Sequence, residues 1–299
     1  MVIQRRKKLV SFFEVRDAYG DPLTEIVDWQ DVLAEVAAAS LKRREQSIKQ
    51  VIHWAQVYPH DGAYHLVFAR ARDEAVSSLD RDTGEILDTE ADTNKPWVEV
   101  SVASFLPETN RFGYVLGTGA SPRSSTLAAW LNRFGAFEEE ISIGPVLSKD
   151  VISKINGAAE ASLVRAKFDS HNATTADGSS LFGAKHALQD SFGDVEVELV
   201  VRVKGRISGR REDERRRVAA AAQDLIGKDF KRAVAQIVNY DDEGNPHRED
   251  VDFLNNRITK KKYIDVTDEE GRSVRIKSAV QAINQAADAM KADLYDLDR

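Results

Sequence analysis

The chain has no cysteine, and this absence excludes several kinds of site. Disulfide bonds, thiolate zinc sites, iron–sulfur clusters and cysteine nucleophiles all need that residue. The six histidines form no HExxH or comparable metal pair, so the sequence predicts neither a metal nor an organic cofactor. No run of about 18 apolar residues is present. A chain without cysteine or an apolar span is typical of the cytoplasm, which is where we expect this protein.

The start of the chain resembles a signal peptide only briefly. "MVIQRRKKLVSFFEV" is basic and then apolar, but the apolar part stops at Val15, before Arg16 and Asp17. No small-residue cleavage site follows. We therefore expect this stretch to belong to the folded protein, with a strand from residue 9.

An overall excess of positive charge is also lacking. The 299 residues carry 42 Lys and Arg against 49 Asp and Glu, for a net charge of −7. Residues 1–194 hold that whole excess, while residues 195–299 are neutral. Bulk charge therefore predicts no general affinity for nucleic acid, and any such binding must come from a local patch.

Hydrophobic periodicity predicts an α+β protein with mixed or antiparallel sheets and helices packed on them. An Asp-Gly turn predicts a hairpin between residues 51–59 and 63–72. Asp28 and Ser121 are expected to cap helices, and Gly135 to end one. Further strands are expected over residues 9–16, 96–107, 111–117, 139–147, 159–168, 195–205, 229–240 and 260–267. Helices are expected over residues 28–48, 119–135, 211–227, 251–258 and 278–294.

A polar segment divides the predicted elements into two groups. Residues 169–194 are rich in Ser, Gly, Asp, Asn and Thr, which is typical of a linker. We accordingly expect an N-terminal α+β domain over residues 1–170, a linker over 171–194 and a C-terminal α+β domain over 195–299.

The strongest functional signal is a basic stretch in the C-terminal part. Residues 202–217 hold eight Lys and Arg against three Asp and Glu. Seven of the eight are arginine, whose planar fork suits phosphate groups. Further basic runs follow in the sequence and could share the same face. The candidate DNA-binding residues are Arg202, Lys204, Arg206, Arg210, Arg211, Arg215, Arg216, Arg217, Lys231, Arg232, Lys260, Lys261 and Lys262.

Three alternatives stand beside phosphate contact. The basic stretch is equally typical of a solvated helix with internal Glu–Arg pairs. A metal-dependent nuclease needs clustered carboxylates, for which Glu196 and Glu198 are the candidates. The arginines could also dock an acidic partner, including the chain's own residues 80–92, which carry six carboxylates.

The order of elements resembles the RexA family, the DNA-binding component of the phage lambda superinfection-exclusion system. The similarity is carried by "SFFEVR", by "YHLVFARARD", by "SFLPETNRFGYVLGTGASPRSSTLAAWLN" and by "VELVVRVKGRISGRREDERRRVAAAAQDLI". The resemblance implies a non-enzymatic homodimer that binds double-stranded DNA without sequence preference and senses infecting phage inside the cell. It also implies a membrane channel partner encoded by a neighbouring gene. The DNA-binding residues above come from the basic runs alone.

Overall fold

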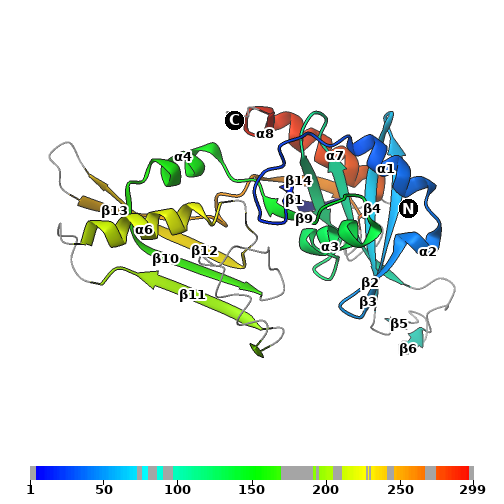
Figure 1. Ribbon diagram of the computed structural model, residues 1–299. Helices are drawn as coiled ribbons and strands as arrows, with labels where there is room; N and C mark the ends of the chain where they lie inside the picture. The colour runs from blue at the N-terminus through cyan, green and yellow to red at the C-terminus, as the bar shows by residue number, and fades with distance from the viewer. Residues whose placement is uncertain are drawn as a thin grey trace.

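The protein folds into two antiparallel sheets with helices packed on them, which confirms the α+β prediction. The computed structural model describes residues 5–72, 76–79, 86–89, 97–169, 191–192, 195–204, 211–226, 228, 230–240, 246–266 and 274–295. Figure 1 shows the four-stranded sheet at one end of the molecule and the larger sheet at the other. Within the described residues, no helix has both the length and the apolar character needed to cross a membrane.

The larger sheet has the strand order β14-β1-β8-β7-β4-β3-β2, and β9 also pairs with β1. A separate two-stranded pair is formed by β5 and β6. The strands span Arg5–Asp17 (β1), Glu45–Ile48 (β2), Val51–His60 (β3), Ala63–Ala71 (β4), Val76–Leu79 (β5), Ile86–Thr89 (β6), Val98–Phe105 (β7), Arg111–Leu116 (β8), Ile141–Pro145 (β9) and Thr259–Asp265 (β14).

The β3–β4 hairpin forms where its Asp-Gly turn predicts it. Asp61 and Gly62 both adopt positive φ, at 50° and 78°. This left-handed pair gives a two-residue turn whose twist matches the flanking strands. His60 therefore pairs directly with Ala63.

Helices cover both faces of the larger sheet. On one face, Trp29 and Leu33 of α1 and Trp130 of α3 pack against Phe68 and Phe112. On the other face, the helix α7 packs over β1, β7 and β8. Gly113 of β8 permits the close approach of α7, because a Cβ there would lie 2.3 Å from the Ile283 Cγ2 atom. The helices span Trp29–Ala38 (α1), Leu41–Arg44 (α2), Ser124–Phe134 (α3), Ile276–Ala289 (α7) and Lys291–Tyr295 (α8).

The second sheet has the strand order β11-β10-β12-β13 and is covered on one face by two helices. Residues alternate along its strands, so apolar side chains face the helices and charged side chains face the opposite way. The elements span Lys149–Gly157 (α4), Glu160–Asp169 (β10), Glu196–Arg202 (β11), Glu212–Gln223 (α6), Arg232–Tyr240 (β12) and Pro246–Asp252 (β13).

The two sheets do not divide the chain at the polar segment. β10 precedes residues 171–194 but pairs with β11 and β12, which follow them. β14 and α7 lie near the end of the chain but join the larger sheet, through pairing with β1 and packing on its core. Which sheet each of these elements joins is determined by long-range strand pairing. The composition of the chain does not indicate that pairing. The segment itself lies outside the described residues except for residues 191–192.

Three local predictions are wrong. The helix expected over residues 28–48 ends at Ala38, and β2 begins at Glu45. Residues 251–258 form the end of β13 and a turn in place of a helix. Ser121 does not cap α3, because its hydroxyl accepts a hydrogen bond from the Thr118 amide at 2.9 Å and Arg123 takes the capping position. The Asp28 cap and the Gly135 ending, at φ 76°, are confirmed.

Two buried histidines of the larger sheet should make the fold sensitive to mild acid. Burial holds the pKa of His53 and that of His65 below the ordinary value. Hydrogen bonds with the backbone carbonyls of Val51 and His60 offset this lowering in part, for His53 and His65 respectively. The unfolded chain then binds more protons below about pH 6.5, so unfolding is favoured as the pH falls.

We expect the urea midpoint to be lower at pH 5.5 than at pH 7.5. The double variant His53→Gln/His65→Gln should show a clearly smaller pH difference than the wild type. A wild-type midpoint that stays constant or rises between pH 7.5 and pH 5.5 would contradict this account.

Candidate nucleic-acid interface

A cationic pocket opens on the helix-free side of the second sheet. We call it the phosphate pocket; it has a volume of about 420 Å³. Three cations line it, Arg202 and Lys204 at the end of β11 and Arg248 on β13. Its other lining residues are Ser162, Leu163, Val203 and Gln236.

Strand register explains why these side chains meet. Arg202 pairs with Leu163, and Leu163 pairs with Gln236 on the next strand. Arg248 pairs with Val238, two residues from Gln236 and therefore on the same face. The register of β10 shifts between Ala161 and Leu163, so the pocket lies at a β-bulge.

Polar groups within the pocket are already ordered. The Ser162 hydroxyl donates a hydrogen bond to the Gln236 Oε1 atom at 2.8 Å. The side-chain Nε2 of Gln236 in turn donates to the Asp250 carboxylate at 2.8 Å. None of the three lining cations forms an ion pair with a carboxylate of the described residues. The pocket can therefore accept an anion and bind it through charge-assisted hydrogen bonds.

The same sheet face holds a second group of charges, in which two carboxylates form ion pairs with three cations. Glu196 lies between Lys167 and Lys231, at 2.7 and 3.0 Å, and these hydrogen bonds hold the pKa of Glu196 below its usual value. Arg165 approaches Glu198 at 3.8 Å. The two carboxylates offset two of these three cations. Arg232 beside Lys231 is exposed with no ion pair among the described residues, so this end of the face also stays positive.

The helix α6 presents only some of its predicted cations to solvent. Arg211, Arg216 and Arg217 are exposed. The Arg211 guanidinium donates to the Lys204 carbonyl at 2.9 Å, which joins the start of the helix to the rim of the phosphate pocket. Arg216 pairs with Glu212 one turn away, as expected for a solvated helix.

Arg215 has to be withdrawn from the predicted DNA-binding set. Its side chain is only 3 % exposed, and its guanidinium pairs with the buried carboxylate of Glu160. The Tyr240 hydroxyl donates to the same carboxylate at 3.0 Å. The pair raises the pKa of Arg215, so the charge is permanent but buried. Arg206 and Arg210 lie outside the described residues.

A second basic surface forms where β1 pairs with β14. We call it the basic ribbon, and it consists of Arg5–Lys8 of β1 and Lys260–Lys262 of β14. Lys8 pairs with Lys262 in the strand register, and Lys7 pairs with Tyr263. Tyr263 is 67 % exposed, so an aromatic ring lies among the cations. The carboxylate of β14 belongs to Asp265, which forms an ion pair with Arg5 at 3.1 Å.

Sequence reasoning missed two parts of these surfaces. In the sequence, Arg5–Lys8 was considered only as the basic part of a stretch that briefly resembles a signal peptide. No local pattern indicates that this segment pairs with Lys260–Lys262. Arg248 stands among acidic neighbours in "PHREDVD", which hides its charge. Alternation along a strand would have placed Arg248 on the face opposite the apolar Val251. This alternation is the sequence signal that could have identified Arg248.

The described residues give little support to the two other hypotheses, a metal-dependent nuclease and docking of an acidic segment. The Glu196 and Glu198 side chains are both ion-paired, and the described residues contain no group of three or more potential metal ligands. In the acidic segment 80–92, only residues 86–89 are described, so docking of that segment lies outside the described residues. No family model matches the chain, and a search of curated proteins finds no similar one.

Proposed function

We propose that this protein binds double-stranded DNA through its phosphate backbone, without reading the base sequence. The observation that carries the proposal is the phosphate pocket, which three cations line without forming an ion pair to any carboxylate of the described residues. Arg202, Lys204 and Arg248 come from two different strands, so a chain with a net charge of −7 concentrates positive charge in one place.

Phosphate contact suits these surfaces better than base recognition. Specific recognition of duplex DNA usually inserts a helix or a two-stranded ribbon into the major groove. The cations of the phosphate pocket lie on the face of a sheet, and those of the basic ribbon lie on a sheet edge. Contacts of this kind position a protein on the duplex and carry no sequence information.

The resemblance to the RexA family extends the proposal to a biological role. On that basis we propose a non-enzymatic, homodimeric sensor of phage infection in the cytoplasm, acting with a membrane channel partner. The gene neighbourhood tests this extension separately from DNA binding. A gene for a multi-span membrane protein beside this one would support it, and its consistent absence in related genomes would count against it.

The binding proposal is tested with two labelled duplexes of the same length and unrelated sequence. We expect fluorescence anisotropy at low salt to give dissociation constants that agree within about threefold, because phosphate contacts ignore sequence. Incubating a plasmid with the protein and Mg²⁺ or Mn²⁺ tests the nuclease alternative in the same preparation. Absence of any complex at low salt would refute the proposal, and metal-dependent cleavage lost in Glu196→Gln would replace it with the nuclease.

A further inference from the structure

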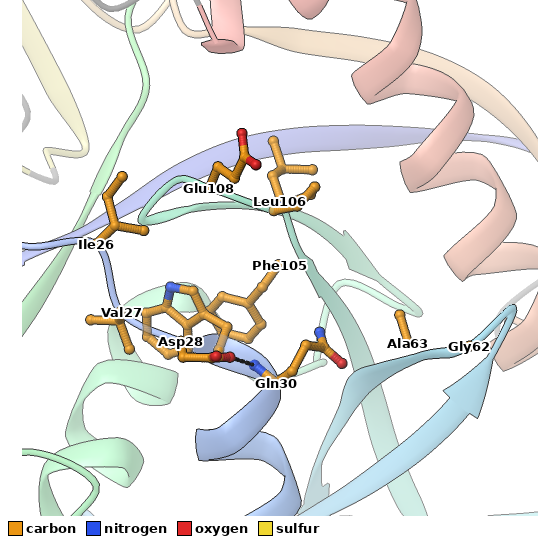
Figure 2. A pocket seen from close by; sticks show the side chains of 11 residues that line it. Ile26, Val27, Asp28, Gln30, Gly62, Ala63, Phe105, Leu106 and Glu108 are labelled. Atoms are coloured by element: carbon orange, nitrogen blue, oxygen red, sulfur yellow. Dashed lines mark hydrogen bonds between the residues drawn. The ribbon is translucent and has the colours of Figure 1, made fainter.

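We infer that the larger sheet carries a binding pocket for a small planar heteroaromatic molecule, uncharged or cationic, with the chemistry of a nucleobase. The pocket lies between the start of α1, the β3–β4 turn and the β7–β8 turn, and has a volume of about 480 Å³ (Figure 2). This volume falls in the range of small-molecule sites. The inference is independent of DNA binding, because the phosphate pocket lies on the other sheet.

The lining is suited to a flat apolar ring. Trp29 and Phe105 stack with their ring centroids 4.0 Å apart, at an interplanar angle of 14°. Ile26, Val27 and Leu106 line the pocket with them, as Figure 2 shows for the labelled side chains. Apolar walls with a few polar groups are the usual composition of a ligand site.

A buried donor in the lining lacks a partner. The Trp29 side chain is 4 % exposed, and its Nε1 atom has no hydrogen-bond acceptor among the described residues. A buried N–H group without an acceptor costs about 1–3 kcal/mol. The other buried indole shows the normal arrangement, since Trp130 Nε1 donates to the Arg44 carbonyl at 3.0 Å. A ring nitrogen or carbonyl of a bound molecule is the acceptor that Trp29 lacks.

The charges at the mouth of the pocket select against anions. Asp28 and Glu108 are exposed, and no cation stands among the described residues that line the pocket. An amino group on the ligand can donate to Glu108, whereas a phosphate would be repelled by both carboxylates. Glu108 adopts a left-handed backbone conformation, with φ 56°. The β7–β8 turn accounts for this conformation, as the other hairpin turns do for Lys49, Gln50 and Asp61.

The pocket walls are braced before any ligand arrives. Asn110 accepts from the Val27 amide at 2.9 Å and donates to the Glu25 carbonyl at 2.7 Å, which fixes the loop to the β7–β8 turn. Gln30 accepts from the Tyr64 amide at 2.7 Å, which fixes α1 to the β3–β4 hairpin. The frame of the pocket is therefore fixed, and binding needs a local shift that exposes the Trp29 N–H, which is covered in this structure.

The test follows the four tryptophan indole N–H resonances of the ¹⁵N-labelled protein during titration with adenine. We expect a saturable shift of the Trp29 signal, assigned with Trp29→Phe. The Trp54 and Trp130 indoles already donate to Glu45 and to the Arg44 carbonyl, so they are internal controls and should not move. Trp29→Phe keeps the aromatic stack and should weaken adenine binding about fivefold, as for one hydrogen bond, which calorimetric titration of both proteins measures.

Two further arms decide the outcome. Ala63→Trp, which fills the mouth of the pocket, should abolish the shift while the other indole signals keep their folded positions. Adenosine monophosphate should bind at least about fivefold more weakly than adenosine, because of the carboxylates at the mouth. No saturable Trp29 shift up to the solubility limit of adenine, or a shift retained in Ala63→Trp, would overturn the site. Equal binding of the phosphate-bearing ligand would overturn its selectivity.

Discussion

Replacing Arg215 with methionine is expected to lower the free energy of unfolding by about 3–5 kcal/mol, as for a buried ion pair that loses one partner. Methionine keeps much of the apolar volume, so the loss comes mainly from Glu160. That carboxylate is 4 % exposed, and among the described residues it would keep only the hydrogen bond from the Tyr240 hydroxyl. Urea denaturation at pH 7.5 measures the difference.

A neighbouring arginine is the matched control. Arg216 lies on the same helix and is exposed, and its pair with Glu212 spans one turn. Arg216→Met should therefore cost no more than about 0.5 kcal/mol. Adding Glu160→Gln to Arg215→Met should restore part of the lost stability, since it removes the uncompensated charge. A cost below about 1 kcal/mol for Arg215→Met would contradict the buried pair.

This result also determines how DNA binding must be tested. A charge reversal at Arg215 would weaken binding by unfolding the second sheet, whatever the surface does. Arg211, Arg216 and Arg217 remain suitable for charge reversal because they are exposed.

The triple variant Arg202→Glu/Lys204→Glu/Arg248→Glu is expected to lower duplex affinity at least about 100-fold at low salt, since three phosphate contacts become repulsive. The loss should be the same for duplexes of unrelated sequence. All three side chains are exposed, so the fold should persist, which circular dichroism and the urea midpoint can confirm.

The control for this variant changes the net charge by the same amount elsewhere. Lys42, Lys277 and Lys291 are exposed cations outside the phosphate pocket and the basic ribbon. Their triple replacement by glutamate should weaken binding much less. Equal losses in both triple variants would show that only bulk charge matters, which would refute the phosphate pocket as the contact site.

The sequence predicted most of the individual elements because periodicity and turn chemistry are local. The Asp61–Gly62 turn and the Asp28 cap are set by their own residues and were confirmed. The pairing of β14 with β1 joins residues about 250 positions apart, and no local pattern contains that information.

The same limit applied to the candidate site. Arg202 and Lys204 were both in the predicted set, and both line the phosphate pocket. The burial of Arg215 depends on Glu160 of β10, which approaches only in the folded protein. Helical spacing places Arg215, unlike its neighbour Arg216, on the face of Val218 and Ala222, but the predicted set was chosen by charge and included both.

The salt dependence of DNA binding tests the central claim most directly. Dissociation constants of the wild type and of the Arg202/Lys204/Arg248 triple variant should be measured over a range of salt concentrations on one duplex. We predict a steep linear dependence for the wild type and a slope shallower by about 2.7 for the variant, at about 0.9 for each lost phosphate contact. An unchanged slope in the variant, or a wild-type affinity that does not respond to salt, would contradict phosphate binding in this pocket.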